Sequence, residues 1–380
     1  MNRSATDKVR AIVDCELLSK GSVLAAWLQN DVMSIPSSFD RQRPPPSAWI
    51  NDGEKFGLVG LSVKLDGDIA PGMLTHHFRA LTDATFTIPP LWREWLGSIR
   101  TGEVEDCNLF LLSKLPSLTP NIYDAENHRL RQPVWNFYVG LLLASTFSPA
   151  HKPVMLTGAR QSGHIDIREQ TDLDCPVPCL FRFYPPVAAA DIRQAAKLGE
   201  NMEALATAFP APKCWRLNRV LHLYTEARIS PDPLERIHQY CRCIEGLILP
   251  AAGQTKRQFK SRTELFIGPR DHDLMDELYD VRSAVEHLHE NRYLESFDRE
   301  TRLDLVRKEA IAEHIARAAL ARIVGCKPLW SGFANTSALA RFWQLPVADR
   351  QAIWGEPIDP LDALADYDPT YIPDGHLGGP

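Results

Sequence analysis

Three side chains that lie close together in the sequence have the chemical types needed to act on a phosphate ester. Arg282 and Ser283 are adjacent, and His287 follows the arginine after four intervening residues. A guanidinium can bind two phosphate oxygens in a fork, and an imidazole can accept a proton from an attacking hydroxyl near neutral pH. The serine hydroxyl could orient the imidazole or contact the phosphate. We therefore take Arg282, Ser283 and His287 as the candidate catalytic residues.

The apolar residues around these side chains recur with helical spacing. Between positions 271 and 290, steps of four, three, four and three separate the members of one stripe: Leu274, Leu278, Val281, Val285 and Leu288. Such a stripe is typical of a helix that packs on one side. On this helix Ser283 and His287 share a face, whereas Arg282 lies about 140° around the axis from His287. The arginine must therefore reach toward the histidine with its long side chain.

The same segment also allows a purely structural interpretation. Arg282 and Glu286 are four residues apart, so they could form an ion pair on the helix surface. His287 and His289 could simply be exposed at the end of the helix. In addition, the carboxylate at position 286 could compete with phosphate for a cation. Both interpretations predict the same helix and differ in where its side chains point.

The wider pattern, from about position 190 to about position 330, resembles the Apea-like branch of the HEPN superfamily. The residues that carry the resemblance are Glu245 in the run Ile-Glu-Gly-Leu-Ile, Arg262 in the run Lys-Ser-Arg-Thr-Glu-Leu, and the group Tyr279, Arg282, Ser283 and His287. The chain departs from the family's pattern at two positions. Glu286 stands where Val or Ile is common, and Leu288 stands where Gly is common.

The resemblance implies a function for the candidate residues. Many members of the superfamily are ribonucleases that need no metal, and in the family a dimer places two such helices side by side. The resemblance therefore implies a homodimer that cleaves RNA without a cofactor. It implies that His287 acts as general base, that Arg282 holds the phosphate, and that Ser283 supports either His287 or Arg282. A toxin or phage-defence effector with an N-terminal sensing domain would fit. The alternative is a non-catalytic HEPN module for dimerisation or for binding RNA, a nucleotide or a protein.

The hydrophobic periodicity changes at position 184, where Tyr-Pro-Pro interrupts regular structure. Before this point, apolar and polar residues alternate over 59–65, and two further strands are predicted over 154–157 and 164–167, joined by a turn. An apolar helix is predicted over 132–146. Beyond the break the pattern is helical, with helices predicted over 189–208, 215–227, 234–249, 256–266, 271–290 and 301–324.

These patterns predict an α+β protein. A mixed α/β N-terminal domain of unknown role is expected at 1–185, followed by an all-α, HEPN-like helical bundle at 186–330. Short helices and an acidic, loosely ordered tail are expected at 331–380, because apolar residues suggest two short helical pieces and the part after Gly355 is rich in Pro, Asp and Gly. An enzymatic function in the N-terminal domain would have no recognisable motif behind it.

Composition restricts the remaining function classes. The 380 residues carry a net charge of −6, so no overall basic field favours nucleic acid. The most apolar run, 135–147, is too short to cross a bilayer, and the start lacks signal-peptide features, which predicts a cytoplasmic protein without membrane contact. The eight cysteines are scattered. The pairs Cys175 with Cys179 and Cys241 with Cys243 lack the spacing of zinc ligands, so no metal site is expected.

Overall fold

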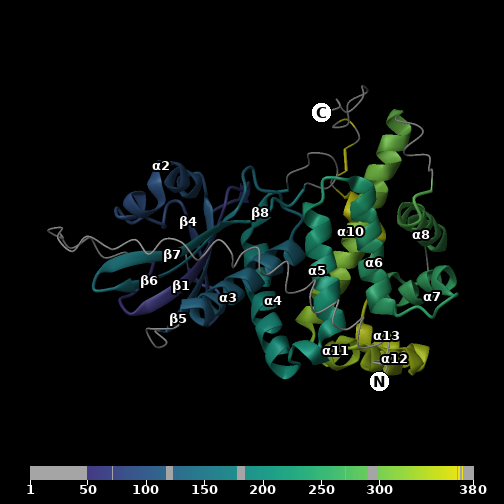
Figure 1. The fold of residues 1–380 in the computed structure, drawn as a ribbon. Coiled ribbons are helices and arrows are strands. Elements are labelled where there is room, and N and C mark those ends of the chain that lie inside the picture. The colour runs from purple at the N-terminus through teal and green to yellow at the C-terminus, as the bar shows by residue number, and fades with distance from the viewer. Residues whose placement is uncertain are drawn as a thin grey trace, which may run out of the picture. The chain divides into compact units, whose positions relative to one another are not determined.

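The computed structural model describes residues 49–70, 72–116, 123–177, 185–269, 271–289 and 298–365, together with 367, 368 and 370. Its fold is α+β, with an antiparallel sheet in the N-terminal half and a helical C-terminal region (Figure 1). The predicted fold class is therefore confirmed. The predicted division into domains stays a prediction, and the described residues before and after position 185 share one hydrophobic core.

Six strands form the main sheet in the order β3-β4-β5-β1-β6-β7, and every neighbouring pair is antiparallel. Their bounds are Glu54–Leu61 for β1, Gly72–Met73 for β3, Phe78–Thr82 for β4, Leu109–Pro116 for β5, Val154–Gln161 for β6 and His164–Asp172 for β7. Two further short strands, β2 (Leu65–Asp66) and β8 (Val187–Ala188), pair in parallel with each other.

Two helices belong to the sheet region, and the others follow it in the chain. Their bounds are Trp92–Glu105 for α2, Tyr123–Ala144 for α3, Ala189–Ala208 for α4, Trp215–Ile229 for α5, Pro233–Ile248 for α6, Thr255–Ile267 for α7, His272–Glu286 for α8, Arg299–Gly325 for α10, Lys327–Phe333 for α11, Thr336–Gln344 for α12 and Val347–Trp354 for α13. In Figure 1, α5, α6 and α10 run side by side, and the contacts between them agree with this view.

The central strand β1 is covered on both faces. Val59 belongs to the core that includes α3, whereas Leu58 belongs to a second core that includes α2. Because neighbouring strand residues point to opposite faces, the two helices cover opposite sides of the sheet. The approach of α3 is close enough to require glycine in the strand, since a Cβ atom on Gly57 would lie 2.3 Å from the carbonyl oxygen of Leu130.

The predicted strand over 59–65 was wrong in its bounds, because β1 begins at Glu54 and ends at Leu61. Its start was missed because a strand that is buried on both faces has no apolar–polar alternation. Its end is set by Asn108. The side chain of Asn108 accepts a hydrogen bond from the Val63 N–H (2.9 Å) and donates one to the Val63 carbonyl (2.7 Å), which replaces the next strand pairing. The two strands predicted over 154–157 and 164–167 are present as β6 and β7, which pair as a hairpin; both strands are longer than predicted, so the turn between them is shorter.

The helical half follows the predicted periodicity closely. α4 has the predicted bounds, and from 189 to 325 the described residues contain helices and no strand. The helix predicted over 132–146 corresponds to the second half of α3, which begins nine residues before the predicted start, at Tyr123, and ends two residues before the predicted end, at Ala144. By contrast, α8 ends at Glu286, four residues before the predicted end at 290. The reason is local: Leu288 has a φ of 55°, in the left-handed region, so the helix cannot continue and His287 becomes its C-cap residue.

The part beyond position 331 contains short helices, and the acidic segment that follows them contacts α7. Ile358 is buried, and its N–H donates to the Phe266 carbonyl at 2.7 Å. A 3-10 turn, Pro360–Leu364, follows and is capped by the Asp359 carboxylate, which accepts from the Leu361 N–H. The aspartates and prolines of this tail therefore form a capped turn. Residues 366, 369 and 371–380 lie outside the described residues.

Candidate functional site

The helix that carries the candidate residues, α8, packs against α6 and α7. Of the predicted apolar stripe, Leu278 and Val281 are buried in α8, whereas Leu274 and Val285 are half-buried; Met275, which the stripe did not include, is buried as well. Leu288 was also expected in the stripe, but it is 91% exposed because it follows the end of the helix. The end of α8 therefore presents an apolar side chain to solvent, directly after His287.

Arg282 points toward α6 and lies between two carboxylates. Its Nη2 donates to Oε2 of Glu245 at 3.1 Å, and the same nitrogen is 3.9 Å from Oε2 of Glu286. The guanidinium is also 5.8 Å from the ring centre of Tyr279, and the side chain is only 15% exposed. Burial raises the pKa of Glu245, although the positive charge of Arg282 opposes this shift. Arg282 thus links α8 to α6 in the single chain.

Glu286 has a second and closer partner on α6. Its Oε2 is 2.6 Å from Nε2 of His238, a side chain that is 8% exposed. On its other side, Nδ1 of His238 is 3.5 Å from Oε2 of Glu235. The hydrogen bond with His238, followed by the charge of Arg282, lowers the pKa of Glu286. Two contacts from α6, His238 to Glu286 and Glu245 to Arg282, therefore hold the last turn of α8.

His287 and Ser283 lie outside this set of ion pairs. The His287 side chain is exposed at the C-cap, where its backbone N–H donates to the Ser283 carbonyl at 3.1 Å. Its ring lies 5.6 Å from the ring of His289. Within the described part of the chain, no hydrogen bond or ion pair joins the side chains of Arg282, Ser283 and His287. The structure therefore brings the three residues to one end of α8, and their catalytic roles stay a prediction.

Arg262, the remaining residue of the resemblance, has a structural role. Its Nη1 donates to the carbonyl oxygens of Ile248 (2.7 Å) and Leu249 (2.5 Å) at the end of α6. Its guanidinium also stacks over Trp343 of α12, at 5.2 Å from the ring centre. Arg262 thus satisfies carbonyl groups that a helix end leaves without a partner. It fixes α7 against the helix that carries Glu245 and His238.

Sequence reasoning missed His238 and gave Glu245 only through the resemblance. Both lie on α6, seven residues apart, so they share one helix face. This spacing is the only signal that the sequence contains, and it does not say which helix the face will contact. Glu286 was considered as a partner of Arg282, but its shorter contact with His238 was not expected.

No group of three side chains that could hold a metal ion occurs among the described residues. Cys241 and Cys243 are buried on α6, and their thiols contact the carbonyl oxygens of Leu278 and Val220. Burial raises the pKa of both thiols, so they remain protonated and inert. Cys175 is partly exposed, and Cys179 lies outside the described residues.

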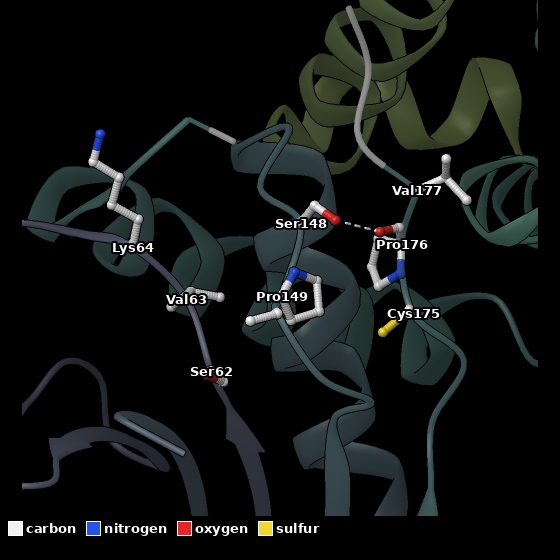
Figure 2. A pocket seen from close by; sticks show the side chains of 9 residues that line it. Ser62, Val63, Lys64, Ser148, Pro149, Cys175, Pro176 and Val177 are labelled. Carbon is white, nitrogen blue, oxygen red and sulfur yellow. Dashed lines mark hydrogen bonds between the residues drawn. The ribbon is translucent and has the colours of Figure 1, made fainter. Parts of the chain in front are cut away.

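A cavity of about 660 Å³ lies away from α8, between residues 62–64, 148–150 and 175–177. Figure 2 shows that the hydroxyl of Ser148 points to the Pro176 carbonyl, to which it donates at 2.7 Å. The thiol of Cys175 and the ammonium of Lys64 are the titratable groups of its lining. Burial raises the pKa of Cys175, which opposes its use as a nucleophile. This cavity therefore offers less catalytic chemistry than the end of α8.

No helix among the described residues is both long enough and apolar enough to span a membrane. Comparisons of the chain with protein-family models, with curated proteins and with solved structures gave no match. The resemblance to the HEPN superfamily therefore depends on the sequence of this chain alone.

Proposed function

We propose that the helical region is an Apea-like HEPN domain and that the protein is a metal-independent endoribonuclease whose site is completed by a second copy. One observation carries the proposal. Glu245 and Arg282, two of the residues on which the resemblance depends, are 37 positions apart in the sequence and in contact at 3.1 Å. The exposed imidazole of His287 lies just beyond them at the end of α8. In this proposal Arg282 is the phosphate-binding cation and His287, the C-cap residue of the same helix, is the general base.

In the proposed reaction, a ribose 2′-hydroxyl attacks the adjacent phosphate and transfers its proton to His287. The 5′-oxygen leaves and takes up a proton, which produces a 2′,3′-cyclic phosphate and a 5′-hydroxyl end. Arg282 stabilises the negative charge that the phosphate oxygens gain in the transition state. Ser283 supports the phosphate or the imidazole. The residues involved need no metal ion for this chemistry.

The variant Arg282→Lys tests the role of the guanidinium. Lysine keeps the positive charge but loses the planar fork, so we expect the cleavage rate of single-stranded RNA to fall on the order of 10²-fold. The measurement is the single-turnover rate with labelled RNA in EDTA, beside wild-type protein. Wild-type cleavage that needs a divalent metal would argue against the proposed mechanism. So would an Arg282→Lys variant with the wild-type rate.

The proposed second copy would use the exposed end of α8. Leu288 is a large apolar side chain that is 91% exposed, and a dimer would remove it from water. We expect light scattering to show a dimer at micromolar concentration and the variant Leu288→Asn to weaken it. Asparagine tolerates the left-handed backbone at this position, so the variant changes the apolar surface without straining the turn. A wild-type monomer under these conditions would contradict the composite site.

A second candidate function is a non-catalytic HEPN module that dimerises or binds RNA, a nucleotide or a protein. The observation that favours it is the pairing of Arg282 with Glu245, because a guanidinium that is largely buried beside a carboxylate is less available to phosphate. RNA binding without any cleavage by the wild-type protein would support this function over the first.

A further inference from the structure

Glu286 is a carboxylate shared unequally between two positively polarised groups. Its Oε2 is 2.6 Å from Nε2 of His238 and 3.9 Å from Nη2 of Arg282. The first distance is that of a strong hydrogen bond, and the second is too long for one. The carboxylate is therefore drawn to His238 on α6 and away from the arginine on its own helix.

Without His238, the geometry of α8 would favour a direct contact between Glu286 and Arg282. Arg282 and Glu286 are four residues apart, the spacing at which oppositely charged side chains on a helix meet. Glu286 is exposed and has room to turn, while Arg282 is already held on its other side by Glu245. A second carboxylate in direct contact would neutralise the guanidinium further and would compete with any anion for its N–H groups.

We propose that His238 is a positioning residue, which keeps Arg282 available to an anionic ligand by holding the carboxylate of Glu286 away from the guanidinium. The identification of the ligand as an RNA phosphate rests on the proposed function. The restraint of Glu286 by His238 does not depend on that function. His238 is nearly buried on α6, where its Nδ1 lies 3.5 Å from Glu235 and its Nε2 lies 2.6 Å from Glu286 of α8. With the histidine in place, Arg282 and Glu286 remain at an ion-pair distance of 3.9 Å and do not form a hydrogen bond.

The restraint can be tested by protein stability, without any ligand. A double-mutant cycle with Arg282→Gln and Glu286→Gln gives the coupling between these side chains from urea unfolding. We expect weak coupling in the wild-type background. With His238→Ala, the coupling should rise by about two- to fivefold in the folding equilibrium constant, since the pair can then close. Equal coupling in both backgrounds would overturn the inference.

The matched control is Asp280, which lies on the same helix and pairs with Lys256 at 2.6 Å. A cycle with Arg282→Gln and Asp280→Asn removes the same charges, but Asp280 has no contact with Arg282 among the described residues. Its coupling should be unchanged by His238→Ala. A parallel rise in both cycles would mean that His238→Ala changes the electrostatics of α8 in general, and it would also overturn the inference.

The effect on ligand binding is measured with a single-stranded oligodeoxynucleotide, which lacks the attacking 2′-hydroxyl and is not cleaved. We expect His238→Ala to weaken binding roughly tenfold. Glu286→Gln should restore binding in that background, whereas Asp280→Asn should not, although it removes the same charge. His238→Gln keeps a hydrogen-bond donor and should retain part of the affinity. Failure of Glu286→Gln to restore binding would reduce His238 to a structural support and overturn the inference.

These measurements separate the inference from the proposed function. If the wild-type protein neither cleaves RNA nor binds the oligonucleotide, the proposed function fails, and the unfolding cycle alone decides whether His238 restrains Glu286. If the protein cleaves RNA but the coupling between Arg282 and Glu286 is the same with and without His238, the proposed function survives and the inference fails. Circular dichroism of each variant shows that the compared proteins are folded.

Discussion

Replacing His287 by alanine is expected to lower the rate of RNA cleavage by about 10²–10⁴-fold while the protein stays folded. The loss follows from removing the proposed general base. The fold should survive because the side chain is exposed, and its imidazole has no hydrogen-bond partner within the described residues. The measurement is the single-turnover rate with labelled single-stranded RNA, together with the thermal unfolding midpoint.

The matched control for this variant is His289→Ala. The rings of His287 and His289 are 5.6 Å apart, and both are exposed at the end of α8. Removing His289 takes away the same chemical group from the same surface, so a general effect of losing an imidazole there would appear in both variants equally. We expect the His289→Ala variant to cleave within a few-fold of wild type. Equal rates for wild type and His287→Ala would place any cleavage elsewhere in the protein.

Replacing Glu313 by alanine is expected to lower the free energy of unfolding by about 3–5 kcal/mol. Glu313 lies on α10 and is 1% exposed. Its carboxylate accepts from Nε of Arg317 at 3.0 Å and contacts the hydroxyl of Tyr224 at 2.8 Å. Burial disfavours the charged carboxylate, but Arg317 and Arg228 outweigh this and lower the pKa of Glu313 overall. The variant therefore removes the negative charge that balances the buried guanidinium groups of Arg317 and Arg228.

Urea unfolding measures this loss, with Arg307→Ala as the control. Arg307 lies on the same helix and is exposed, so its removal should change the free energy of unfolding by no more than about 0.5 kcal/mol. A similar small change for Glu313→Ala would mean that the surrounding residues rearrange to satisfy Arg317 and Tyr224. The network would then contribute little to the stability of the contact between α5 and α10.

The sequence predicted a helix or strand correctly where the spacing of its apolar residues is enough to determine it. The bounds of α4 follow from its helical pattern, and the β6–β7 hairpin follows from two short apolar runs around a glycine-containing turn. The bounds of β1 were not predictable in this way. Burial on both faces removes the alternation that marks a strand, and the end of β1 depends on a side-chain contact from Asn108, 45 positions from its partner Val63.

At the candidate site, too, contacts from other elements could not be predicted from the local sequence pattern. The helical periodicity around Arg282 predicted a helix, and the structure contains it. Its end depends on the backbone of Leu288, a residue type that seldom adopts a positive φ, so the sequence predicted a longer helix. The partners of Arg282 and Glu286 come from α6, because the packing of α8 on α6 selects them. A pattern along one helix identifies its faces, but it does not identify the residues that another helix brings to them.

The chemical nature of the RNA ends after cleavage tests the central claim most directly. Single-stranded RNA is incubated with the wild-type protein in EDTA, and the products are analysed by mass spectrometry and by end labelling. The proposed imidazole mechanism predicts a 2′,3′-cyclic phosphate on one fragment and a 5′-hydroxyl on the other, both absent with His287→Ala. Fragments with 3′-hydroxyl and 5′-phosphate ends, or intact RNA after incubation with wild-type protein, would contradict the claim.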